Sequence, residues 1–174
     1  MKTVPYFIIL LILYCSSATG QNTDFNQNVS SVDSIIETLY SVISGEKGEK
    51  RNWEKFKYLF HPEARLIPTI KNDKGLGVNY LTPQDYINRF GQKLEENGFY
   101  EKEIHRVTER FGNIVHLFST YESYQSKTDN TPFARGINSI QLLYDGTRWW
   151  IINIYWQSES SKHPLPDKYL PKNK

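Results

Sequence analysis

The chain has 174 residues, and its 21 Lys and Arg residues against 19 Asp and Glu give a net charge of +2. A charge this close to zero argues against nucleic acid as a partner, because proteins meet nucleic acid with strongly basic surfaces. A single cysteine, Cys15, precludes a disulfide within the chain. These features predict one domain of moderate size that carries no disulfide framework and binds no nucleic acid.

The first twenty residues have the pattern of a signal peptide. Lys2 supplies a positive charge, residues 6–14 form a short apolar run, and the small residues before Gln21 fit a cleavage site. The run is shorter than the roughly 20 residues that span a bilayer. A retained anchor and a lipoprotein signal at Cys15 are the alternatives. We expect residues 1–20 to be removed, which leaves a secreted or periplasmic protein with no stable membrane association.

Helical patterns dominate the start of the mature chain. Residues 21–30 are polar and are expected to form a flexible lead-in. Apolar residues at helical spacing predict a helix over residues 32–43, capped by Ser31 or Ser30. A second, shorter helix is predicted to follow Asn52, with Trp53 and other aromatic residues on one stripe.

The next segment mixes one strand with a third helix. Residues 64–70 are predicted to form a strand, and residues 71–79 a polar, glycine-containing loop. Thr82-Pro83 is typical of a helix start, because it combines a capping hydroxyl with a proline at the first helical position. This helix should end at Asn97-Gly98.

After Gly98 the pattern changes to strands. Residues 100–110 and 114–125 flank a turn at Gly112-Asn113. Residues 134–157 form an apolar ribbon around Asp145-Gly146, a strong hairpin signal. Residues 160–174 are a Pro/Lys-rich tail, which we expect to be extended. Three helices followed by an antiparallel meander indicate an α+β fold.

Three stretches resemble the nuclear transport factor 2-like superfamily. They are residues 53–64 (WEKFKYLFHPEA), Thr82-Pro83 and residues 145–151 (DGTRWWI). The resemblance covers about residues 32–159 and assigns residues 31–159 to one such domain. It implies a cone-like α+β barrel, in which three N-terminal helices pack on a strongly curved antiparallel sheet. It also implies that one sheet face lines a cavity and that the other can form a dimer.

Strand parity divides the ribbon into two faces, because successive side chains alternate. One predicted face holds Gly136, Asn138, Ile140, Leu142, Tyr144, Trp149, Ile151, Asn153 and Tyr155. The other holds Arg135, Ile137, Ser139, Gln141, Leu143, Trp150, Ile152, Ile154 and Trp156. Both faces are apolar, which predicts a homodimer through the sheet.

Polar residues that interrupt these apolar strands are candidates for ligand contacts, since a buried polar group needs a partner. The predicted ligand-binding residues are Arg135, Asn138, Gln141, Tyr155 and Trp156. The alternative is that Asn138 and Asn153 satisfy one another across a dimer contact.

The first hairpin offers a candidate acid–base pair. Parity across Gly112-Asn113 places Glu101, Glu103, His105, Val107 and Glu109 on one face with His116, Phe118, Thr120, Glu122 and Tyr124. His105 with Glu103 or Glu122 could exchange protons with a substrate; an exposed polar stripe is the alternative. No compact metal-ligand motif is present, so we predict neither a metal nor a cofactor.

Three functions fit these features. The first is a binding domain that holds a small, largely apolar ligand in the cone. The second is a lyase, isomerase or hydrolase that acts on a small hydrophobic substrate through His105 and a carboxylate. Enzymes of the resembled fold, such as ketosteroid isomerase, imply an Asp or His base inside the cone, but the sequence carries no matching motif. The third is a dimeric interaction module without catalysis. The Pro-rich tail could also cover the cavity mouth.

Overall fold

The computed structural model describes residues 24–73 and 75–172. The predicted signal peptide, residues 1–20, lies outside them. Among the described residues, no helix is both long enough and apolar enough to cross a membrane.

The first two helices begin at capping side chains. Helix α1 (Val32–Ile43) starts at Ser31, whose hydroxyl accepts a hydrogen bond from the Ser34 backbone NH. Helix α2 (Trp53–Tyr58) starts at Asn52, whose side chain accepts from the Lys55 backbone NH. The apolar stripe of α1 is buried, with Ile35 and Ile36 almost fully enclosed. Both caps agree with the sequence pattern.

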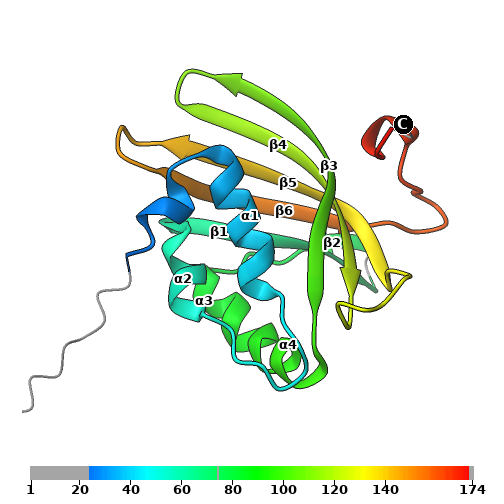
Figure 1. Ribbon diagram of the computed structural model, residues 1–174. Helices are drawn as coiled ribbons and strands as arrows, with labels where there is room; N and C mark the ends of the chain where they lie inside the picture. Colours follow the sequence, from blue (N-terminus) through cyan, green and yellow to red (C-terminus); the bar gives the residue numbers. More distant parts are fainter. Residues whose placement is uncertain (1–23, 74, 173–174) are drawn as a thin grey trace, which may run out of the picture.

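The third helical run lies between two strands, so it is not N-terminal to the whole sheet. It consists of α3 (Pro83–Tyr86), a π-helical segment η2 (Ile87–Gly91) and α4 (Gln92–Asn97). Thr82 caps it as predicted, in a reciprocal arrangement with Asp85. Figure 1 shows α1 and the α3–α4 run on one face of a curved sheet.

The sheet differs from the prediction in topology. Its strands are β1 (Phe60–Asn72), β2 (Gly75–Val78), β3 (Tyr100–Phe111), β4 (Ile114–Tyr124), β5 (Ala134–Tyr144) and β6 (Trp149–Ser158). Their order is β2-β1-β6-β5-β4-β3, with β1 parallel to β6 and the other pairs antiparallel. The sheet is therefore mixed and remains open between β2 and β3, rather than closing into a barrel. Strand β2 occupies part of the segment predicted to be a loop.

A β-bulge in β6 changes the predicted faces of the ribbon. Leu142 pairs with Ile151 but Gln141 pairs with Asn153, so Ile152 is the extra residue. A bulge reverses the alternation beyond it. Ile154 and Trp156 consequently share the inner, helix-covered face with Asn138, Ile140 and Leu142. Asn153 and Tyr155 lie on the outer face, which corrects the parity assignment for this half of β6.

A second bulge has the same effect in β3. His105 pairs with Thr120 but Glu103 pairs with Tyr121, so Ile104 is the extra residue. Glu101 and Glu103 therefore lie on the inner face. His105 lies on the outer face. The predicted parity, by contrast, placed Glu101, Glu103 and His105 on the same face.

The two ends of the described chain pack against the domain. In the segment 21–30, expected to be a flexible lead-in, Asn26–Val29 form a 3₁₀ helix and Val29 is fully buried. In the tail, Tyr169 packs on Phe118 with ring centroids 4.9 Å apart, and its carbonyl accepts a 2.6 Å hydrogen bond from Thr120 Oγ1. Phe118 and Thr120 lie on the outer face of β4, and Figure 1 shows the C-terminal segment away from the helices.

Candidate functional site

A cavity of about 400 Å³ lies between the inner face of the sheet and the helices. Most of its lining is apolar: Leu39, Ile43, Phe56, Leu66, Pro68, Tyr86, Phe90, Leu94, Phe99, Ala134, Ile154 and Trp156. Its polar lining consists of Glu101, Tyr121, Ser123, Asn138 and Ser158. Among these residues Glu101 is the one that can carry a charge at neutral pH.

Glu101 is held in place from β4 and from the end of α1. Ser123 Oγ donates a 2.9 Å hydrogen bond to Glu101 Oε2, and the Glu101 backbone NH donates to Ser44 Oγ at 3.0 Å. Burial raises the pKa of the Glu101 carboxyl to about 7, although hydrogen bonds from Ser123 and Asn138 oppose the shift. The cavity thus contains a carboxyl group that changes charge near neutral pH.

Tyrosines surround this carboxyl group. Tyr40 on α1, Tyr86 on α3 and Tyr121 on β4 all have a raised pKa, chiefly because they are buried and also because they face Glu101. For Tyr121 the pKa rises to about 12, so its hydroxyl stays protonated at neutral pH. No cationic side chain in the described part of the chain contributes to the pKa of Glu101.

A chain of hydrogen bonds fixes the amide of Asn138 at the edge of the cavity. Asn138 Nδ2 donates to Tyr40 Oη at 3.0 Å, and Tyr40 Oη lies 2.7 Å from Ser119 Oγ. Ser119 Oγ donates to Glu103 Oε1 at 2.5 Å. These contacts join four elements, α1, β3, β4 and β5, and set the position of α1 on the sheet.

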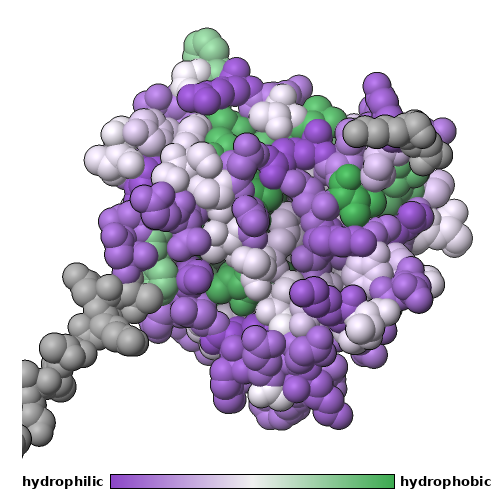
Figure 2. Space-filling view, viewed as in Figure 1, coloured by the Kyte–Doolittle hydropathy of each residue, from purple (hydrophilic) through white to green (hydrophobic). Residues whose placement is uncertain are grey.

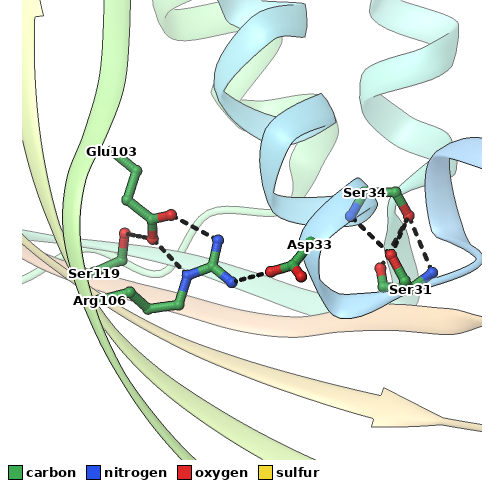
Figure 3. A network of polar contacts seen from close by, with 6 residues as sticks. All are labelled: Ser31, Asp33, Ser34, Glu103, Arg106 and Ser119. Carbon is green, nitrogen blue, oxygen red and sulfur yellow. Dashed lines mark hydrogen bonds and ion pairs between the residues drawn. The ribbon is translucent and has the colours of Figure 1, made fainter.

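Glu103 ends this chain in an ion pair. Arg106 donates to both carboxylate oxygens of Glu103, at 2.8 and 2.6 Å, and to Asp33 Oδ1 at 2.7 Å (Figure 3). A bidentate arginine contact is a strong, charge-assisted pair of hydrogen bonds with a fixed geometry. Both carboxylate oxygens of Glu103, a predicted catalytic candidate, are therefore bonded to Arg106.

The other two members of the predicted acid–base group are on the outer face. His105 is separated from Glu103 by the thickness of the sheet, because of the bulge at Ile104. Glu122 accepts a 2.6 Å hydrogen bond from Tyr124 Oη and forms an ion pair with Lys102 at 3.3 Å. The structure therefore does not bring these three side chains together in the cavity.

The five predicted ligand-binding residues divide between the two faces. Asn138 and Trp156 line the cavity. Arg135 pairs with Glu159 through bonds of 2.9 and 3.2 Å, and Gln141 accepts from Asn153 Nδ2 at 3.1 Å. Tyr155 is on the outer face with 43% of its surface exposed. Within the chain, Asn153 thus bonds to Gln141 on the neighbouring strand.

Sequence reasoning missed Glu101 as a site residue. Parity grouped it with His105, and only the bulge at Ile104 separates them. Nothing in the local sequence marks that bulge. No group of three or more potential metal ligands occurs among the residues that the structure describes.

Comparisons with known proteins identify the fold. The sequence matches no protein-family model, and no curated protein matches it. Among solved structures, a protein of unknown function with a cystatin-like fold from Nostoc punctiforme has a TM-score of 0.56 at 10% identity, covering 75% of this chain and 90% of that one. A nuclear transport factor 2-like protein of unknown function from Silicibacter pomeroyi has a TM-score of 0.51 at 12% identity, covering 73% and 92%.

A third match has the same fold name. It is a nuclear transport factor 2-like superfamily protein from Salmonella enterica, with a TM-score of 0.51 and 15% identity, covering 76% of this chain and 87% of that one. At such identities the likeness concerns the fold and not the activity. The chain therefore has the fold of the nuclear transport factor 2-like superfamily.

Proposed function

We propose that this protein binds a small, largely apolar molecule in the cavity between the helices and the inner face of the sheet. The observation that carries the proposal is a cavity of about 400 Å³, which is within the range of small-molecule sites and has mostly aromatic and aliphatic walls. A few polar groups on one side of it, Glu101, Asn138 and Tyr121, would orient the ligand.

Blocking the cavity tests this proposal. Ala134 lines the cavity and is only half-buried, so Ala134→Trp can fill the space without replacing a core residue. The matched control is Gln141→Trp, on the same strand but exposed on the outer face. We expect a neutral aromatic probe, 2-phenylethanol, to bind the wild type and the control but not Ala134→Trp, as measured by NMR titration. No binding to the wild type would refute the proposal.

Proton-transfer catalysis in the same cavity is a second candidate. It is favoured by Glu101, whose pKa of about 7 suits an acid or base that works near neutral pH. Glu101 replaces the His105 pair in this reading. A panel of epoxides, enones and β-hydroxy ketones tests it: Glu101→Gln should abolish any turnover, and His105→Ala should preserve it.

The outer sheet face supports a proposal of homodimer formation. Val107 and Tyr155 expose 39% and 43% of their surfaces there. The tail covers part of the same face through Tyr169. Sedimentation of the mature chain at micromolar concentration tests this, and a monomer mass would contradict it.

Export is proposed from residues 1–20 alone. Expression of the full chain with its natural N-terminus in a bacterial host should yield a mature protein that begins at Gln21. N-terminal sequencing of the periplasmic fraction measures this, and an uncleaved chain in the cytoplasm would contradict it.

A further inference from the structure

Two acidic residues of β3, Glu101 and Glu103, differ in their partners, and this difference indicates the kind of ligand that the cavity binds. Glu101 is an acid without a cationic partner among the described residues, whereas Glu103 next to it on β3 is fully paired with Arg106. The charge of Glu103 is therefore balanced by an arginine, whereas the carboxylate of Glu101 faces an apolar space. A buried carboxylate is costly in its ionised form unless a cation or hydrogen-bond donors compensate it.

The walls around Glu101 suit a cation. Tyr86, Phe90, Phe99, Tyr121 and Trp156 line the same cavity. Aromatic faces attract ammonium groups, and the attraction grows when water is excluded. A ligand ammonium would thus find both a carboxylate and aromatic walls in one place.

A groove outside the cavity has the same charge preference. It lies between α1 and the start of β3, and Glu101 lines both the groove and the cavity. Its ionisable lining includes more acids than bases: Asp33, Glu37, Glu49, Glu101 and Glu103 against Lys102 and Arg106. Because an excess of one sign of charge in a cleft attracts ligands of the opposite sign, the groove favours a cation near Glu101.

We propose that the ligand of this cavity is an apolar amine, whose ammonium group pairs with the Glu101 carboxylate while its hydrocarbon part fills the aromatic space. This inference rests on the proposed binding function and specifies its ligand class. Hydrogen bonds from Ser123 and Asn138 hold the Glu101 carboxylate in place.

Protonation of Glu101 makes the inference testable by pH. An aliphatic amine, like the lysine side chain, has a pKa of about 10 and stays charged between pH 5.5 and 8. In the cavity, Tyr40, Tyr86 and Tyr121 face Glu101, and their raised pKa values keep them neutral over this range. The groove that Glu101 also lines carries the charged residues Asp33, Glu37, Glu49, Lys102, Glu103 and Arg106. Affinity for an amine should therefore rise with pH as Glu101 ionises, whereas affinity for a neutral analogue should not.

The experiment compares 2-phenylethylamine with 2-phenylethanol by NMR titration at pH 5.5 and pH 8. For the wild type at pH 8, we expect the amine to bind at least about tenfold more tightly than the alcohol, and this ratio to shrink at pH 5.5. Glu101→Gln should remove the preference, so that the amine and the alcohol bind with similar affinities at both pH values. Glu96→Gln, which removes an exposed carboxylate on α4, is the charge-matched control and should keep the preference.

Each outcome has a defined meaning. Equal affinities for the two probes at pH 8, or a preference that persists in Glu101→Gln, would overturn the amine assignment and leave the apolar binding function standing. If neither probe binds the wild type, both proposals fail. The pH series on the wild type is independent of the variants: a ratio that does not change with pH also overturns the assignment.

Discussion

Arg51 donates a 3.1 Å hydrogen bond to the carbonyl of Leu94, at the last turn of α4, and a 3.0 Å bond to the carbonyl of Ile43, at the last turn of α1. Its side chain is buried, with 7% exposed. Because Ile43 and Leu94 both line the cavity, this one guanidinium joins two of the walls.

Replacing Arg51 should therefore destabilise the domain. Arg51→Met leaves carbonyls at two helix ends without a donor, and each buried polar group without a partner costs about 1–3 kcal/mol. We expect a loss of about 3 kcal/mol or more in the free energy of unfolding, measured by urea denaturation. Arg89→Met, which removes an exposed arginine, should stay within about 0.5 kcal/mol. Equal stability of the two variants would contradict the bridging role.

The raised pKa of Glu101 predicts a pH dependence of stability. A carboxyl group whose pKa is about 7 when folded and near its ordinary value when unfolded favours the folded state most at low pH. This stability is fully present below the unfolded pKa and is lost as the pH rises towards 7. The full loss is about 3 kcal/mol.

Glu101→Gln isolates this effect from the other titrating groups. The free energy of unfolding of the variant minus that of the wild type should increase from pH 4.5 to pH 7.5. The variant is therefore expected to gain stability relative to the wild type at the higher pH. Urea denaturation of both proteins across this range measures the difference. A difference that is flat or falls with pH would show that the Glu101 carboxyl is not shifted upward.

The candidate site was harder to predict than the fold because it depends on two single-residue bulges. Capping residues such as Ser31, Asn52 and Thr82 act locally, and the sequence shows them directly. The extra residues Ile104 and Ile152 are β-branched and resemble any other strand residue. Each one reverses the faces of half a strand, which moved Glu101 and Trp156 to the cavity side and Tyr155 away from it. The parallel pairing of β1 with β6 likewise depends on contacts far apart in the chain.

Tyr40 should contribute more to stability than a tyrosine with a similar contact at the surface. Its hydroxyl accepts a hydrogen bond from Asn138 and contacts Ser119, and only 5% of the residue is exposed. Tyr40→Phe leaves the Asn138 amide without this acceptor and should cost about 1–3 kcal/mol. Tyr100→Phe removes one exposed 2.9 Å bond to Glu46 and should cost less than about 0.5 kcal/mol. Thermal and urea unfolding of both variants test this, and comparable losses would contradict it.

The tail should limit self-association through the outer face. Figure 2 shows a largely hydrophilic surface with separate apolar patches, one at the tip of the β3–β4 hairpin and another beside the C-terminal segment. The tip carries Phe111 and Ile114, which are 84% and 58% exposed. Tyr169 covers Phe118 further along the same face, and Glu159 anchors the tail by accepting a 3.0 Å hydrogen bond from the Leu165 backbone NH.

Removal of residues 166–174 should therefore uncover Phe118 and extend the apolar outer face. We expect this truncated chain to self-associate at lower concentrations than the full-length mature protein, because a larger continuous apolar surface favours association. Removal of residues 171–174 alone keeps Tyr169 in place and serves as the matched control. Sedimentation velocity over a concentration series measures the effect. If the longer truncation associates no more strongly than the control, the tail does not act as a cover of this face.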